Sequence, residues 1–168
     1  MNPAEEIVAI VNEHNQVIGA VPRGEMRAQK LLHRASFVLV FNARGELYVQ
    51  RRTMTKDIYP GRYDPATGGV VLAGESYEEN AVRELAEELG IRDVALQAYS
   101  DFYFTDADVK VWGRVFSCCY DGELQLQAEE VESVSMMTLE QILEPESSDD
   151  FASDSLTAVQ HYVLHSRS

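Results

Sequence analysis

The sequence predicts one compact domain, residues 1–168, that mixes helices and strands. A chain of this length can bury a substantial core, and single domains commonly have this size. Apolar runs bounded by turn residues, such as 37–41 and 47–50, indicate strands. A capped run over 76–90, with apolar residues at helical spacing, indicates a helix.

The first part of the chain has the pattern of strands joined by turns. Apolar runs at 7–11 and 17–21 flank a polar stretch, which predicts an N-terminal hairpin over about 6–22. A short helix is expected near 24–32. Further elements follow in order: a strand at 37–41, a turn at 42–45, a strand at 47–50, a loop over 51–63 and a short strand near 67–72.

The helix over 76–90 is the clearest element. Ser76 and Glu79 form a capping-box pattern, and Gly90 lies where a left-handed C-cap is expected. Its predicted apolar face is Ala81, Val82, Leu85 and Leu89. Beyond it we expect strands at 95–104, 109–120 and 131–137, a short helix at 138–143, an acidic loop at 144–150 and a closing helix at about 154–165, capped by Ser153, Asp154 or Ser155.

The charge of the chain limits its partners. The formal net charge of −14 repels the phosphates of polymeric nucleic acid and an anionic membrane surface. No apolar run is long enough to span a bilayer. A phosphorylated small molecule is an expected ligand only if bound cations reverse the local charge.

The two cysteines are adjacent in the sequence. Cys118 and Cys119 are unsuited to a disulfide framework and lack a CxxC spacing. We expect them on one strand, with one side chain pointing inward and one outward, in a cytoplasmic protein.

Three acids of the predicted helix fall on one side of it. Glu84, Glu87 and Glu88 lie within about 100° of one another at helical spacing. Like charges this close repel, so such a face is either solvated or binds a hard cation through carboxylate oxygens.

The flanking sequence favours the cation. From Gly69 to Ile91 the chain reads Gly-x5-Glu-x7-Arg-Glu-Leu-x-Glu-Glu-x-Gly-Ile. This resembles the Nudix box at every fixed position, and a chance match has a probability on the order of 10⁻⁷ or less. The resemblance implies an α+β Nudix fold, in which a mixed, curved β-sheet lies between helices and the box (69–91) forms a loop-helix-loop catalytic motif.

The resemblance also implies an activity, a cofactor and roles for residues. It implies a pyrophosphohydrolase that cleaves a phosphoanhydride bond in a small diphosphate substrate, with Mg²⁺ as cofactor and Mn²⁺ as a substitute. The implied metal ligands are Glu84, Glu87, Glu88 and the carbonyl of Gly69, and Glu75 is expected to pair with Arg83 and orient the motif.

A carboxylate is needed to accept a proton from the attacking water. The candidate bases are Glu87 from the box and Glu129, Glu130 or Glu132 from a late acidic run, for which a solvated loop is the alternative. The resemblance also implies catalytic roles for Arg83 and Glu84. Arg51, Arg52 and Lys56 are basic residues in an acidic chain, and we consider substrate binding and ordinary surface charge equally for them.

Two alternatives belong to the same superfamily. His33 and the basic loop also resemble isopentenyl-diphosphate isomerase, but Thr67, Gly69 and Val111 stand where that enzyme has its cysteine, histidine and glutamate, so His33 is expected to be structural. A non-catalytic nucleotide-binding module is the other alternative, although such modules often lose box glutamates.

The front half of the chain combined with an intact box is similar to the YfcD-like branch of Nudix hydrolases. The segments that carry this similarity are 27–29, 33–35, 55–57, 68–71 and 111–113. The branch does not specify a substrate, and a homodimer is one option because dimers are common in the family.

Overall fold

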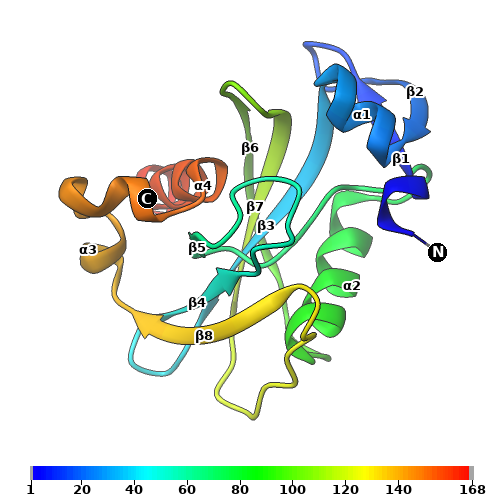
Figure 1. Ribbon diagram of the computed structural model, residues 1–168. Helices are drawn as coiled ribbons and strands as arrows, with labels where there is room; N and C mark the ends of the chain where they lie inside the picture. The colour runs from blue at the N-terminus through cyan, green and yellow to red at the C-terminus, as the bar shows by residue number, and fades with distance from the viewer. Residues whose placement is uncertain (1, 167–168) are drawn as a thin grey trace.

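The computed structural model describes residues 2–166. In this part of the chain, eight strands form one mixed β-sheet, with helices on both faces (Figure 1). The predicted α+β fold is confirmed. The strands are β1 (Ile7–Val11), β2 (Val17–Pro22), β3 (His33–Phe41), β4 (Leu47–Arg52), β5 (Tyr63–Asp64), β6 (Gln97–Thr105), β7 (Lys110–Cys119) and β8 (Val131–Met137). The helices are α1 (Arg23–Gln29), α2 (Tyr77–Leu89), α3 (Leu139–Ile142) and α4 (Ser153–His165), with short 3₁₀ turns η1 (Pro3–Glu5) and η2 (Pro145–Asp150).

Strand β3 organises the sheet. Along one edge it pairs in parallel with β7, from His33 opposite Val111 to Phe41 opposite Cys119. Along its other edge it pairs with β1 only at His33 and with β4 only at Phe41. The middle of this edge is therefore open to another segment.

Residues 67–72 fill that opening. A short strand was predicted here, but the segment makes only isolated bridges, from Leu72 to Val8, from Val70 to Ala35 and from Thr67 to Val38, instead of a continuous ladder. The amide of Ser36 donates to the carbonyl of Gly69 (3.1 Å), and Val38 and Thr67 exchange hydrogen bonds of 2.7 and 2.8 Å. The prediction of a regular strand was wrong because this segment crosses a gap between β1 and β4. Its position sets Gly69 against the middle of β3.

The hydrophobic core has a layer on each side of the sheet. On one side, Ala158 and Val159 of α4 pack with Phe37 and Leu39 of β3. On the other, α2 packs against Val38, Val40 and neighbouring strands. Figure 1 shows α2 and α4 on opposite sides of β3 and β7. Because side chains alternate along β3, this strand supplies both layers.

Helix α2 begins and ends as the sequence predicts. Ser76 and Glu79 form the reciprocal capping box, and Gly90 adopts the left-handed conformation (φ 70°) that ends the helix. The apolar face is smaller than predicted, because Val82 is 58% exposed. These caps fix the direction of the helix and so the position of its glutamates.

Three other expectations have clear outcomes. Helix α4 follows Ala152, which makes no side-chain cap hydrogen bond, so the predicted cap by Ser153, Asp154 or Ser155 was wrong. Cys118 is buried and Cys119 exposed on β7, and both are free, as expected. Within residues 2–166, every helix is too short or too polar to cross a membrane.

Candidate active site

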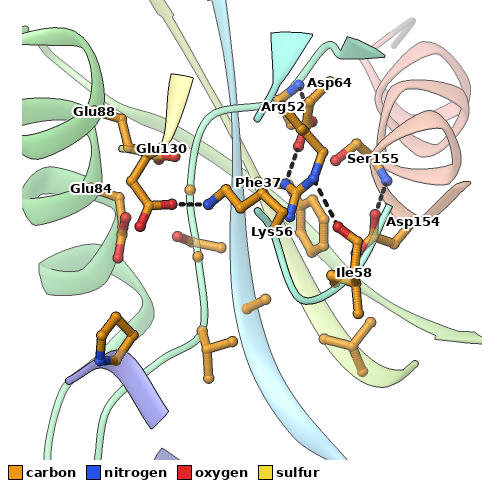
Figure 2. A pocket seen from close by; sticks show the side chains of 18 of the residues that line it. Phe37, Arg52, Lys56, Ile58, Asp64, Glu84, Glu88, Glu130, Asp154 and Ser155 are labelled. Carbon is orange, nitrogen blue, oxygen red and sulfur yellow. Dashed lines mark hydrogen bonds and ion pairs between the residues drawn. The ribbon is translucent and has the colours of Figure 1, made fainter. Parts of the chain in front are cut away.

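A cavity of about 210 Å³ lies between α2, strand β3 with the adjoining residues 68–70, and the start of α4 (Figure 2). Helix α2 supplies one wall, with Glu84 and Glu88. Strand β4 and the following loop supply basic side chains, and α4 closes the inner end with Asp154 and Ser155. Segments that are far apart in the sequence therefore meet around one space.

The end of the cavity opposite Asp154 is lined by Gly69, Glu84 and Glu88, and we call it the outer end. Here Gly69 and Glu84 approach each other closely. A Cβ atom at Gly69 would lie 2.9 Å from both the carboxyl carbon and Oε1 of Glu84. Such a distance is too short for a real side chain, so Glu84 can occupy this position only because residue 69 is glycine. The loop and the helix of the box thus fit together around a carboxylate.

Glu88 is a buried acid, and one of its carboxylate oxygens lacks a hydrogen-bond partner in the described part of the chain. Its side chain lies in the same wall, is 6% exposed, and its Oε2 atom has no hydrogen-bond partner among residues 2–166. A buried carboxylate oxygen without a partner costs free energy, since it has lost water without a replacement. A bound cation would supply the missing partner.

Burial changes the ionisation of both acids. Burial, with repulsion from Glu87 and against attraction by Arg83, raises the pKa of Glu84 to about 7. Burial and the charge of Glu84 raise the pKa of Glu88 well above its ordinary value. Both shifts show that negative charge is under-compensated here, and a divalent cation would lower both pKa values.

Arg83 holds the motif together through the expected ion pair. Its Nε and Nη2 atoms donate to the two oxygens of Glu75 at 2.8 and 3.2 Å. Its Nη1 atom contacts Glu84 at 3.0 Å and donates to Glu87 at 3.1 Å. Glu87 is therefore directed towards Arg83, and its side chain is half exposed.

The donor set suits a hard cation that retains water ligands. Within residues 2–166, no three His, Cys, Asp or Glu side chains form a ready-made metal cluster. The outer end instead offers the carboxylates of Glu84 and Glu88, with Gly69 beside them; the Gly69 carbonyl accepts from the amide of Ser36 and has one further lone pair. Mg²⁺ prefers oxygen donors and usually keeps several waters, so this smaller set fits it.

The structure separates the predicted substrate-binding residues. Arg52 and Lys56 line the cavity, and Lys56 forms an ion pair with Glu130, one of the candidate bases, in Figure 2. Arg51 points elsewhere: its guanidinium contacts Glu132 (3.3 Å), lies over the ring of Tyr63 and does not line the cavity. Adjacent residues on a strand face opposite sides, so only one of Arg51 and Arg52 can reach this space.

Several lining residues were not predicted from the sequence. Arg23 and Arg27 of α1 face the cavity, as do Asp64 and Asp154 at its inner end. The spacing of the two arginines, four residues apart, places them on one face of a helix and is the signal that could have marked them. Their approach to the box depends on tertiary packing and carries no local signal.

His33 also lines the cavity, in a structural setting. Its side chain is buried and its Nδ1 atom lies 2.9 Å from the carbonyl of Leu31. Burial and the nearby charge of Arg27 lower its pKa to about 3, so the ring is neutral. Thr67 accepts a hydrogen bond from Gln50 (2.8 Å) at the position where an isomerase would need its cysteine.

Comparison with known proteins identifies the family of the chain. The NUDIX domain family matches residues 31–158, and the chain belongs to the Nudix family. It is 44% identical over 158 residues to the Nudix hydrolase PA4841 of Pseudomonas aeruginosa, covering 94% of each chain. It is 47% identical to the Nudix hydrolase YfcD of Escherichia coli, covering 92% of this chain and 84% of YfcD. The predicted similarity to the YfcD-like branch is confirmed.

The fold extends to more distant proteins. The crystal structure of DR0079 from Deinococcus radiodurans superposes with a TM-score of 0.79 and 23% sequence identity, covering 94% of this chain and 99% of that one. At this identity the similarity concerns the fold alone. Family membership indicates a hydrolase.

Proposed function

We propose that this protein is a Mg²⁺-dependent hydrolase that cleaves a phosphoanhydride bond in a small, nucleotide-type diphosphate substrate. The observation that carries the proposal is the buried Oε2 atom of Glu88, which has no partner among residues 2–166 and lies beside Glu84. An acid pair that lacks only a cation, in a cavity with basic side chains, matches the charge of a metal-bound diphosphate.

Glu84, Glu88 and the Gly69 carbonyl would hold the cation. When bound, it would neutralise phosphate oxygens and make the phosphorus easier to attack. Arg83 has a positioning role, since it ties Glu75, Glu84 and Glu87 into one arrangement. The residues that hold the cation thus come from the box alone.

Arg52 and Lys56 bind the phosphate oxygens that face the basic wall of the cavity. As water attacks phosphorus, a new P–O bond forms and the bond to the leaving phosphate oxygen breaks. A carboxylate accepts the water proton, and Glu130 and Glu87 are the two candidates because both line the cavity. In the free protein Lys56 pairs with Glu130, and a substrate phosphate would compete for that ammonium group.

The decisive experiment compares substrate hydrolysis by wild type and Glu88→Gln, with Mg²⁺ and with EDTA, followed by chromatography of each substrate and its products. The substrate panel contains nucleoside triphosphates, ADP-ribose, NADH, coenzyme A and isopentenyl diphosphate. We expect turnover of at least one compound that requires Mg²⁺ and falls at least 100-fold in the variant, because the amide cannot replace a charged metal ligand.

Glu78→Gln is the matched control. It makes the same substitution on the exposed side of the same helix, outside the cavity, and should keep wild-type turnover. Mg²⁺-dependent binding of a panel compound without turnover would favour the binding-module alternative. Equal turnover by Glu88→Gln and Glu78→Gln would contradict the proposed site.

A further inference from the structure

Helix α1 contributes to the cavity from outside the region that defines the family. The family match begins at residue 31, whereas Arg23 and Arg27 lie before it. Both side chains nevertheless line the same cavity as Glu84 and Glu88. The N-terminal segment therefore adds two guanidinium groups to a site that also contains Glu84, Glu87 and Glu88 of the common box.

Most N–H donors of the Arg23 and Arg27 guanidinium groups have no acceptor among the described residues. Within the described residues, the Arg27 side chain donates one hydrogen bond, from Nε to Asp57 (3.0 Å), although it is only 15% exposed. Arg23 approaches Asp57 at 3.4 Å and Glu6 at 3.9 Å, without a side-chain hydrogen bond. A guanidinium group has five N–H donors, and those of Arg23 and Arg27 that lack a protein acceptor among the described residues remain accessible to water, which ligand oxygens can replace.

Asp57 is a single carboxylate shared by two cations. Burial would raise its pKa, but Arg27 and Arg23 outweigh that effect and lower the pKa to about 2. Asp57 is thus an anion at neutral pH, and it compensates only one of the two positive charges. Arg52 and Lys56 are already paired with Asp64 and Glu130, so the positive charge that a second anion can approach is that of Arg23 and Arg27.

A second hollow adjoins this point. Its volume is about 400 Å³, and its lining includes the bases Arg23, Arg27 and Lys56, the acids Asp57, Glu129 and Glu130, and residues 3–4 of η1. The two arginines and Lys56 are common to both spaces. An anion held by the arginines would therefore lie at the junction between the cavity and an adjoining space large enough for more of the ligand.

We propose that Arg23 and Arg27 form an anion subsite that binds a phosphate group of the substrate in place of part of the contact with Asp57. Guanidinium groups match phosphate oxygens with paired, charge-assisted hydrogen bonds, which fits this ligand class. The inference rests on the proposed function only in taking the ligand to be a phosphate compound. Because α1 lies outside the family match, the subsite is a determinant of substrate choice.

The test measures binding of methylenediphosphonate, a diphosphate analogue that cannot be hydrolysed, by calorimetry in EDTA. Without metal, Glu84 and Glu88 oppose binding of the anion equally in wild type and in the arginine variants, so differences in affinity between these proteins report the arginines. We expect Arg27→Gln to weaken binding at least tenfold and Arg23→Gln at least threefold. Arg27→Lys, which retains the charge but not the fork of donors, should recover part of the loss.

The variant Asp57→Asn distinguishes anion binding by the two arginines from a purely structural role of the Arg27–Asp57 pair. It removes the competing carboxylate, so we expect binding to tighten several-fold. If the Arg27–Asp57 pair only holds α1 in place, Asp57→Asn would weaken binding as the arginine variants do, and the proposal would be overturned. Thermal unfolding of every variant verifies folding, and Arg44→Gln, at a 79% exposed arginine, is the control for net charge.

Undetectable binding to wild type, or equal binding by wild type, Arg23→Gln and Arg27→Gln, would also overturn the subsite. These outcomes are independent of the hydrolase test, since turnover that needs Mg²⁺ and Glu88 could persist without the subsite. Conversely, the expected binding series without turnover of any panel compound would support the subsite and contradict the proposed hydrolysis.

Discussion

The two ends of the cavity both contain buried carboxyl groups, but they satisfy them differently. At the inner end, Asp64 accepts hydrogen bonds from Arg52 and from the amide of Ala66, both at 3.0 Å. Asp154 accepts from the amide of Ser155 at 2.8 Å. At the outer end, Glu88 retains an oxygen without a partner in the described part of the chain.

This difference indicates different roles for acids of similar burial. The inner acids have protein partners, as expected of groups that stabilise a fold. The outer acids are buried as like charges on one helix and depend on something that the polypeptide does not provide. Unsatisfied and repelling groups are costly, and such cost is typical of sites kept for function. The comparison predicts that changes at the inner end lower stability, with Arg52 in addition affecting phosphate binding, whereas changes at the outer end lower activity alone.

The largest effect is expected from breaking the inner ion pair. Arg52→Gln should lower the free energy of unfolding by roughly 3 kcal/mol, because Asp64 would remain buried without its cation. Arg51→Gln, one residue away, should change it by less than about 1 kcal/mol, because both partners of the Arg51–Glu132 pair are about half exposed. Urea unfolding at neutral pH measures both.

Equal destabilisation by the two arginine variants would remove the distinction between the buried and the exposed pair. It would also mean that the alternation of side chains along β4 does not decide which arginine matters. A loss of unfolding free energy in Arg52→Gln but not in Arg51→Gln would support the view that the acids of the inner end are stabilised by protein partners.

The second effect concerns pH. Burial, with repulsion from Asp64, raises the pKa of Asp154 to about 7 from an ordinary value near 3.8. The folded protein then holds a proton that the unfolded chain has released. The contribution of Asp154 to stability is therefore fully present below the ordinary pKa and is lost as pH rises through about 7. This group alone should account for about 2 kcal/mol between pH 5 and pH 7.

Asp154→Asn should flatten this part of the curve, measured by urea unfolding at several pH values in EDTA. The remaining slope comes from Glu84 and Glu88, whose raised pKa values act in the same direction, and from His33, whose lowered pKa acts in the opposite direction. Because Mg²⁺ should deprotonate those two acids, adding it should change the remaining slope and leave the Asp154 contribution intact. A pH profile that is the same for wild type and Asp154→Asn would refute the assignment.

The outer end could be predicted from the sequence because it is local. Glu75, Arg83, Glu84 and Glu88 lie within one loop and one helix, whose capping box and C-cap glycine are also local signals. Helical spacing then fixes which carboxylates share a side. The strands around it were recognisable for the same reason, since alternation and turn residues act over short distances.

The rest of the cavity could not be predicted, because it depends on contacts between distant segments. Arg23 and Arg27 reach the box only through the packing of α1, and Asp154 joins Asp64 only when α4 closes the inner end. The irregular 67–72 segment has a similar origin, since its pairing is set by the gap between β1 and β4. Sequence patterns identify an element but not its partner.

The smallest effect, and the finest test of the comparison, is expected at Gly69. In Gly69→Ala the new methyl group meets the end of the flexible Glu84 side chain, which can rotate away at little cost to the fold. We therefore expect the thermal unfolding midpoint to stay close to that of wild type, while Mg²⁺-dependent turnover falls roughly tenfold, a change of about 1.4 kcal/mol. Gly19→Ala, where a methyl group meets nothing within 4 Å, is the matched control and should alter neither quantity. If Gly69→Ala lost stability but kept full turnover, the position of Glu84 would serve the fold instead of the chemistry, and the two ends of the cavity would no longer differ in kind.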